Sequence, residues 1–425
     1  RSLLVLVHRW VGLVMAGFLL VAGLTGALLA WNDELEAAIS PHLFRAAPPA
    51  PGALPMDPLL LRERVQAAYP QALLAHVPLA LGPGHALVLR LSALPDLATG
   101  REGDLPNDQV FVDPYTGRVL GERKWGDLGQ GQKNLMPFIY QLHYHLALGV
   151  VGRYAFGVVA LLWTLDCFVG VCLTFPARTR SVPGAGGRKV PQGGGKSWLA
   201  RWWPSWKVRL HGGSYKINFD LHRASSLWLW AMLFVLAWSS VSFNLTEVYE
   251  PVMKAAFAHQ PDDSDIAPLP APRLAPALGW QQAREVGRRL MAEQAREKGF
   301  AVLAEDALSH DPRTGLYQYS VRSSRDVSER GGSTHVVFDA ETGAFKGVWL
   351  PTGAASGDTI RTWLTGLHMA ALWGVPFKMF VMLMGLVVAM LSVTGVVIWW
   401  KKRQGRRRMA MREAAPDRPD RPVLP

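Results

Sequence analysis

The chain has 425 residues, of which 49% are hydrophobic and 17 are tryptophans, and its formal net charge is +12. This composition is too apolar for an ordinary soluble protein, although long polar stretches interrupt the apolar runs. The two cysteines, Cys167 and Cys172, both lie in one apolar segment, which argues against a disulfide framework. The sequence also contains no C-x-x-C-H site for covalent haem and no glycine-rich or Walker-type nucleotide loop.

Four segments are apolar and long enough to cross a membrane, which takes about 20 residues. With the regions between them, they divide the chain into 1–31 (first span), 32–136 (first large loop), 137–175 (second span), 176–218 (basic loop), 219–245 (third span), 246–358 (second large loop), 359–400 (fourth span) and 401–425 (basic tail). The second and fourth segments exceed a single span, so we expect their polar ends to project past the bilayer.

The distribution of charge predicts the orientation of these spans. The segment Pro176–Lys216 carries nine Lys or Arg and no acidic residue, and the tail begins with KKRQGRRR. By the positive-inside rule both regions are cytoplasmic, whereas the two large loops, which carry more acid than base, lie outside. The net charge therefore reflects topology and does not indicate nucleic-acid binding.

The two large loops end in a shared pattern. The first ends in VFVDPYTGRVLGE and the second in VVFDAETGAFKGV. Each predicts a strand, an Asp-x-x-Thr-Gly turn and a second strand, because aspartate and glycine favour tight turns between paired strands. An amphipathic helix is expected before each hairpin, near Leu59–Ala68 and Trp280–Lys298. Each loop thus reads as an α+β domain.

The membrane segments repeat as well. HRWVGLVMAGF in the first span matches HRASSLWLWAM in the third, and YQLHYHLALGVVGRYAFG in the second matches TGLHMAALWGVPFKMFVM in the fourth. The sequence therefore predicts an integral membrane α-helical protein with a four-helix transmembrane bundle, two outer α+β domains and an internal duplication. A pseudo-two-fold axis along the membrane normal is expected, since both halves have the same orientation.

Four histidines occupy equivalent places in this duplication. His8 and His222 lie near the cytoplasmic ends of the first and third spans, and His143 and His368 lie near the outer ends of the second and fourth. Two facing imidazoles in a bundle core suit a bis-histidine b-type haem, so the pairs predict two such sites. Pairing His8 with His143 is excluded because the ~30 Å apolar core separates them.

Other roles for these histidines are open. A lone intramembrane histidine is more often a hydrogen-bond partner between helices, whereas zinc is less suited because each pair offers two or three nitrogens and no thiolate pair. His145 is the alternative outer ligand, two residues from His143 and therefore on a different helix face. His143 is favoured because its Leu-His context matches Leu367–His368.

Charged residues beside the inner pair are further candidates. Arg9 and Arg223 could pair with haem propionates, and they also suit the role of positive-inside anchors that snorkel to the interface. Asp166 is the one carboxylate deep in the second span, where it could orient a ligand imidazole, relay a proton or serve helix packing. The stretch WLARWWPSWKVRL reads as an interfacial segment that anchors the chain or docks an electron donor.

The HRW and HRA helices, the LHYHLALG and LHMAALWG helices and the Asp-x-x-Thr-Gly hairpins together resemble the PepSY-associated transmembrane proteins, over nearly the whole chain. Among these they resemble the bacterial inner-membrane siderophore-iron reductases of the FoxB type. The resemblance implies two PepSY-like periplasmic domains, two non-covalent haem b groups, and His8, His222, His143 and His368 as the ligands. The chain departs from the pattern at His145 and at Ala224, which stands where the first half has Trp10.

This resemblance implies a ferric-siderophore reductase of the bacterial inner membrane, with both termini in the cytoplasm. Electrons would come from quinol or a cytoplasmic flavin protein, because the chain carries no flavin or NAD motif of its own. Two alternatives belong to other classes: a transporter for a siderophore or metal, and a PepSY-type regulatory binding protein. The transporter has little polar pathway through four helices, and the regulator leaves the four histidines unexplained.

Overall fold

The computed structural model describes residues 1–94, 103–177, 181–183, 189–191, 197–211, 213–261 and 266–413. Parts of the expected basic loop, and the tail after residue 413, lie outside these ranges. The chain forms two compact units, which we call the helical unit (1–27, 154–241 and 383–425) and the mixed unit (28–153 and 242–382).

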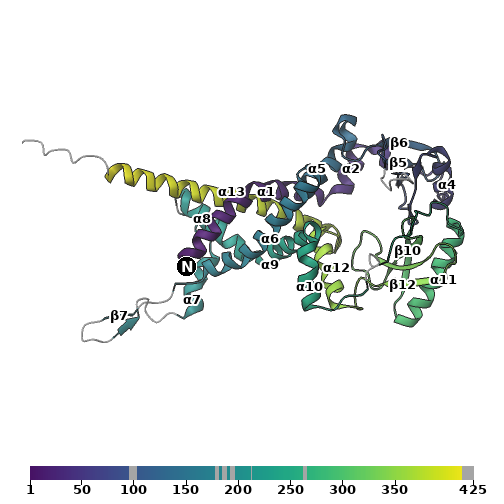
Figure 1. The fold of residues 1–425 in the computed structure, drawn as a ribbon. Coiled ribbons are helices and arrows are strands. Elements are labelled where there is room, and N and C mark those ends of the chain that lie inside the picture. Colours follow the sequence, from purple (N-terminus) through teal and green to yellow (C-terminus); the bar gives the residue numbers. More distant parts are fainter. Residues whose placement is uncertain are drawn as a thin grey trace, which may run out of the picture. The chain divides into compact units, whose positions relative to one another are not determined.

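The helical unit takes most of its residues from long apolar helices. Its elements are α1 (Ser2–Leu29), α6 (Gly149–Thr174), the ribbon β7 (Ser181–Pro183) and β8 (Lys189–Pro191), α7 (Trp198–Trp202), the 3-10 turn η3 (Trp203–Trp206), α8 (Ser214–Trp228), α9 (Trp230–Asn244) and α13 (Gly374–Glu413) (Figure 1).

Helices α1, α6 and α13 are each long and apolar enough to span a membrane, and the bent pair α8–α9 makes a fourth candidate if it counts as one span. Only 17–33% of the residues in the apolar windows of the three long helices are buried. Most side chains in these windows are therefore at least partly exposed, as expected of helices that face lipid. The chain is a helical membrane protein with three or four candidate spans and additional β-sheet regions.

Three expected spans are broken where continuous helices were predicted. The second divides into α5 (Leu135–His145) and α6, and the fourth into α12 (Ser356–His368) and α13. At the first break Leu146, Ala147 and Gly149 have φ between 54° and 58°, and at the second Ala370, Trp373 and Gly374 have φ between 51° and 61°. A right-handed helix cannot continue through such left-handed residues. The third span bends by 73° between α8 and α9.

Helices α1 and α13 approach closely through small residues. A Cβ added to Gly23 would lie 2.5 Å from the carbonyl oxygen of Gly385, and one added to Gly385 would lie 2.5 Å from that of Gly23. Each glycine is followed four residues later by an alanine, Ala27 or Ala389. This is the small-residue spacing that lets membrane helices pack backbone to backbone.

The mixed unit is built on antiparallel sheets. Its helices are α2 (Asn32–Ile39), α3 (Pro41–Phe44), α4 (Pro58–Ala68), α5, α10 (Thr246–Ala256), α11 (Trp280–Lys298) and α12, with 3-10 turns η1 (Leu128–Gln130) and η2 (Gln132–Asn134). Its strands are β1 (Ala72–Leu73), β2 (His76–Pro78), β3 (Leu87–Arg90), β4 (Ser92–Ala93), β5 (Gln109–Val112), β6 (Val119–Arg123), β9 (Val302–Asp311), β10 (Leu316–Ser323), β11 (Thr334–Asp339) and β12 (Phe345–Trp349).

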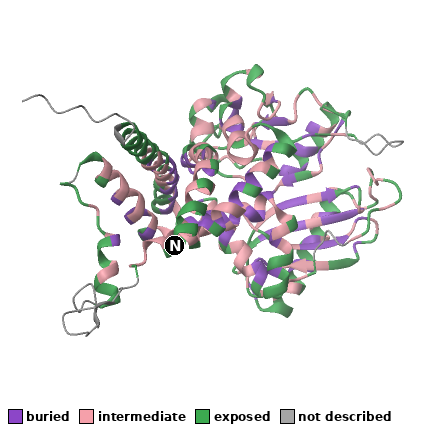
Figure 2. Ribbon diagram, turned by 60° about the vertical axis from the view of Figure 1, so that its left-hand side comes forward, coloured by how far each residue is buried: buried purple, intermediate pink, exposed green. Residues whose placement is uncertain are grey.

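The large sheet has the order β12-β11-β10-β9-β2, and a smaller one has the order β3-β5-β6. Strand β2 comes from the first large loop and pairs with β9 of the second, Val77 opposite Leu308. Buried residues of both loops, among them Leu59, Leu89, Met291 and Tyr317, form one hydrophobic cluster. Figure 2 colours buried residues purple. The two loops, predicted to form separate domains, therefore share a core in the structure.

The predicted hairpins and helices are confirmed. Strands β5 and β6 pair across Asp113-Pro-Tyr-Thr-Gly117, and β11 and β12 pair across Asp339-Ala-Glu-Thr-Gly343. In each turn the aspartate accepts the threonine hydroxyl, at 2.8 Å and 2.9 Å, and the glycine has a φ of 74° or 72°. The amphipathic helices α4 and α11 also form where the sequence predicts them, and α11 packs on strands β9, β10 and β11.

An ionic network joins α11 to the large sheet. The Glu305 carboxylate of β9 accepts hydrogen bonds from Arg284 and Arg288 of α11 and from the Tyr319 hydroxyl of β10. Burial alone would raise its pKa, but these hydrogen bonds lower the pKa of Glu305 to about 2. Arg284 also pairs with Asp57, which caps α4, so one carboxylate and one guanidinium connect elements from both large loops.

Candidate functional site

The helical unit brings His8 of α1 and His222 of α8 together. Their ring centroids are 6.3 Å apart and their planes are inclined by 62°. We call them the first histidine pair. The pairing agrees with the sequence expectation, although the residues are more than 200 positions apart in the chain.

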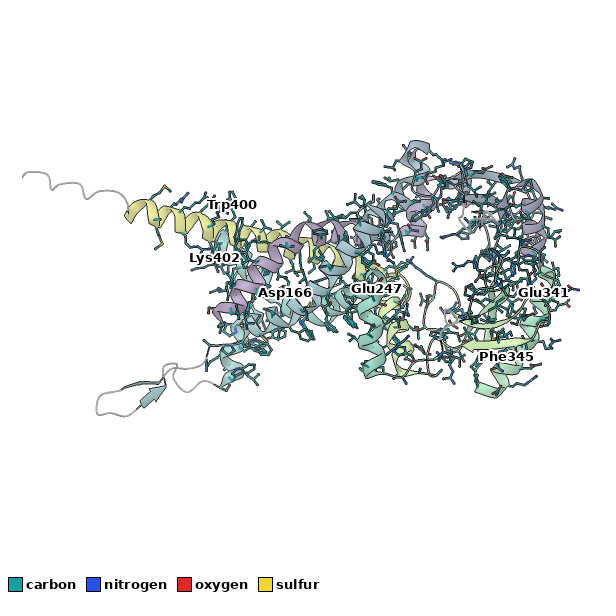
Figure 3. The ribbon with its side chains drawn as sticks, viewed as in Figure 1. Asp166, Glu247, Glu341, Phe345, Trp400 and Lys402 are labelled. Carbon is teal, nitrogen blue, oxygen red and sulfur yellow. The ribbon has the colours of Figure 1, made fainter. Side chains whose placement is uncertain are left out.

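His8 is held by the carboxylate of Asp166 from α6. Its Nδ1 lies 2.9 Å and 3.0 Å from the two carboxylate oxygens. Asp166 is only 8% exposed and lies among the helices of this unit (Figure 3). Because a carboxylate can only accept, this contact places the ring proton on Nδ1 and leaves Nε2 with the lone pair that a metal requires.

His222 is held in the same manner by a different group. Its Nδ1 lies 2.9 Å from the hydroxyl oxygen of Thr394 in α13. That hydroxyl donates to the helix carbonyl oxygens of Met390 at 2.8 Å and Leu391 at 3.1 Å. Its proton is therefore engaged, so it accepts from His222, which again leaves Nε2 as the nitrogen available to a metal.

Two glycines lie against the imidazoles. A Cβ on Gly170 of α6 would be 3.8 Å from His8 Cε1, and one on Gly395 of α13 would be 3.3 Å from His222 Cε1. A Cβ on Gly12, one helical turn after His8, would meet no atom within 4 Å. Gly12 therefore leaves open space beside the first pair, of the kind that a flat ligand could fill.

This space belongs to a cavity of about 430 Å³ within the helical unit, a volume typical of a small-molecule site. Both members of the first pair and Asp166 line it, together with Arg1, Arg9, Gly12, Trp163, Gly170, Arg223, Ser226, Trp230, Gly395, Trp399, Lys402 and Arg406. The Nε atoms of Arg9 and Arg223 are buried without a hydrogen-bond partner among the described residues. Buried guanidinium nitrogens of this kind suit an anionic group in the cavity.

The mixed unit brings together a second histidine pair, His143 of α5 and His368 of α12. Their ring centroids are 6.1 Å apart with planes inclined by 70°, and His368 also contacts the Phe243 ring at 5.2 Å. His145 points elsewhere: its ring contacts Tyr144 at 5.6 Å, and its Nδ1 is buried without a hydrogen-bond partner in the described part of the chain. The geometry therefore favours His143 over His145 as the partner of His368.

The chemistry of both pairs fits a metal held between two imidazoles. Two imidazoles that each bound one metal ion at ~2.0 Å would have their ring centres roughly 6 Å apart. The measured separations of 6.3 Å and 6.1 Å match this spacing. At the first pair the open space beside Gly12 and the orphaned nitrogens of Arg9 and Arg223 add room and charge for a flat dianionic group. A bis-histidine haem fits these residues.

The tryptophan-rich segment packs against the same helical unit. Trp202 donates from its indole nitrogen to the Thr174 hydroxyl at 3.1 Å, and Trp228 donates to the Trp206 carbonyl at 3.1 Å. Trp198 and Trp203 are exposed. Exposed indoles between basic residues are typical of an interfacial segment, which stays the prediction for this stretch.

Two further residues, Asp220 and Thr394, support the site and were not predicted from the sequence. Asp220 is fully buried and pairs with both Arg209 and Arg223, so it fixes the arginine that lines the cavity. Thr394 supports His222. Asp220 carries a usable signal, since a carboxylate two residues before a membrane histidine needs a partner. A single threonine in an apolar helix, such as Thr394, carries no comparable sequence signal.

Comparison with models of known families shows to which family the chain belongs. The model of the PepSY-associated TM region matches residues 5–402. The chain belongs to this family. The PepSY-associated match covers all four histidines of the two pairs. A search of curated proteins gives no match.

Proposed function

We propose that this PepSY-associated protein is a di-haem ferric-siderophore reductase of the bacterial inner membrane. The observation that carries the proposal is the occurrence of two histidine pairs, in two separate units, with ring centres 6.3 Å and 6.1 Å apart. A haem held at such a pair supplies a one-electron Fe(III)/Fe(II) couple inside an otherwise insulating membrane protein.

The residues of this chain have defined tasks in the proposal. His8 and His222 would hold one haem, and His143 and His368 would hold the other. At the first pair both imidazoles would bind through Nε2, because Nδ1 of each ring is engaged in a hydrogen bond. Arg9 and Arg223, whose Nε–H groups have no partner among the described residues, would offer these donors to the carboxylates of the group held at the first pair. Apolar residues of the surrounding helices form most of the cavity lining.

The proposed route runs from the cytoplasm or quinol pool to the periplasm. The basic segments that flank the spans support cytoplasmic termini and periplasmic large loops. The donor would be quinol or a cytoplasmic flavin protein. A quinol gives two electrons and two protons, so one quinol reduces two Fe(III)-chelates. Reduction to Fe(II) weakens the bond to hard oxygen ligands and releases the metal from the siderophore.

The proposal includes an internal duplication with one PepSY-like domain in each half. The repeated Leu-His motifs, the matched hairpins and the matched glycines Gly170 and Gly395 support it. A duplication explains why each half contributes one residue to each histidine pair.

The test is the haem content of the purified chain, measured by optical spectra and by the pyridine haemochrome. We expect two low-spin b haems per chain in the wild type, one in His8→Ala, one in His143→Ala and two in His145→Ala. Reduced chain in proteoliposomes should then be oxidised by a ferric siderophore and re-reduced by quinol or a reduced flavin protein. Chain produced with ample haem that contains none would refute the proposal and favour transport or regulation.

A further inference from the structure

We propose that Asp166 is a positioning residue that lowers the reduction potential at the first histidine pair. The inference rests on the proposed function, because it concerns a haem held by His8 and His222. The inference goes beyond the proposed function because it distinguishes the two ligands by their hydrogen-bond partners. His8 is hydrogen-bonded to a carboxylate and His222 to a hydroxyl.

The surroundings of Asp166 show that its charge is directed at His8. Both carboxylate oxygens lie within 3.0 Å of His8 Nδ1, and the residue is 8% exposed. Among the described residues, the Asp166 carboxylate forms an ion pair with His8 and with no lysine or arginine. Arg9 and Arg223 line the same cavity, yet Arg223 is bound to Asp220 instead.

A buried carboxylate in an apolar helix is costly unless a strong donor compensates it. His8 Nδ1–H is that donor. A carboxylate that accepts from a ligand imidazole makes the ring more basic and gives its Nε2 more electron density. More electron density at the metal favours Fe(III) over Fe(II), so the potential falls. A haem held at this pair would therefore be a stronger reductant.

Thr394 provides an internal comparison. It occupies the corresponding place behind His222, at the same 2.9 Å, but it is neutral and its proton already goes to helix carbonyls. A neutral hydroxyl donates little charge through the imidazole. Removing it should therefore change the potential less than removing the charge of Asp166.

The experiment is a spectroscopic redox titration of the purified full chain in detergent. In Asp166→Asn the amide oxygen still accepts from His8, so the variant removes the charge and retains the hydrogen bond. We expect the Fe(III)/Fe(II) equilibrium of one haem to shift about tenfold toward Fe(II), ~59 mV upward for one electron. The same haem should be the one lost in His8→Ala. In Thr394→Val the shift should be below threefold.

Further variants make each outcome decisive. Asp166→Asn could lose that haem altogether, and Asp166→Glu then serves as the second variant. If Asp166→Glu keeps the haem at the wild-type potential, the result supports the role of the charge. If both variants lose the haem equally, the result overturns the proposed role of Asp166. An unchanged potential in a haem-loaded Asp166→Asn, or an equal shift in Thr394→Val, also overturns it and leaves the proposed function standing. A wild type without haem refutes the proposed function itself.

Discussion

The substitution Gly23→Ala tests the close backbone contact between α1 and α13. The added methyl would lie 2.5 Å from the Gly385 carbonyl oxygen and 2.9 Å from the Ala389 nitrogen, whereas ordinary van der Waals contacts begin at 3.4 Å. Neither atom belongs to a flexible side chain, so α1 and α13 must separate by up to about 1 Å. Overpacking of this size costs about 1–3 kcal/mol.

The control is Gly17→Ala on the same helix, where an added Cβ would meet nothing within 4 Å. The same methyl group there should be neutral or slightly stabilising, since alanine is the better helix former. The measurement is the free energy of unfolding by SDS titration, followed by tryptophan fluorescence. We expect Gly23→Ala to lose about 1–3 kcal/mol relative to Gly17→Ala. Equal stability of the two variants would refute the described contact of α1 with α13.

Other predictions concern the mixed unit and the second pair. His310 is 3% exposed, and burial lowers its pKa to about 4. As the pH falls, this histidine is protonated in the unfolded chain before it is protonated in the folded one, so the free energy of unfolding should fall by up to about 3 kcal/mol between pH 6.5 and pH 4. The decrease over the same pH range should be smaller in His310→Gln. The depressed pKa of Glu305 acts in a lower window: its stabilisation is complete above pH 4.5 and lost toward pH 2. Glu305→Gln should cost about 1–3 kcal/mol near pH 7, seen as faster amide exchange in β9 and α11, and unchanged exchange would refute the network. Substitution of His143, but not of His145, should abolish one haem spectrum, and the reverse result would reassign the ligand.

Local chemistry explains what the sequence predicted well. The Asp-x-x-Thr-Gly turns form because their hydrogen bonds lie within five residues, and the amphipathic helices α4 and α11 follow from their periodicity. A third copy, Asp311-Pro-Arg-Thr-Gly315, closes the hairpin of β9 and β10 with the same bonds and a glycine φ of 68°. The prediction of two such hairpins was therefore incomplete, because this third motif is equally visible in the sequence.

Non-local packing explains what the sequence did not reveal. The left-handed residues Leu146, Ala147, Ala370 and Trp373 carry no preference for that conformation, so surrounding structure imposes the helix breaks. The pairing of β2 with β9 joins short strands from different loops, and periodicity within either loop is silent about it. In the site, the repeated sequence motifs predicted both histidine pairs, whereas the role of Thr394 follows only from its contact with His222 in the structure.

The β2–β9 pairing also sets an order of assembly. During synthesis the first large loop is complete before β9 is made. Strand β2, which contains Val77, therefore has no partner strand while the intervening helices are synthesised. The shared core then closes only when the second large loop arrives. Until β9 is made, β2 lacks its partner strand, and unpaired strand edges of partly folded chains favour aggregation. Two halves produced as separate polypeptides would have to find each other before either could complete its sheet.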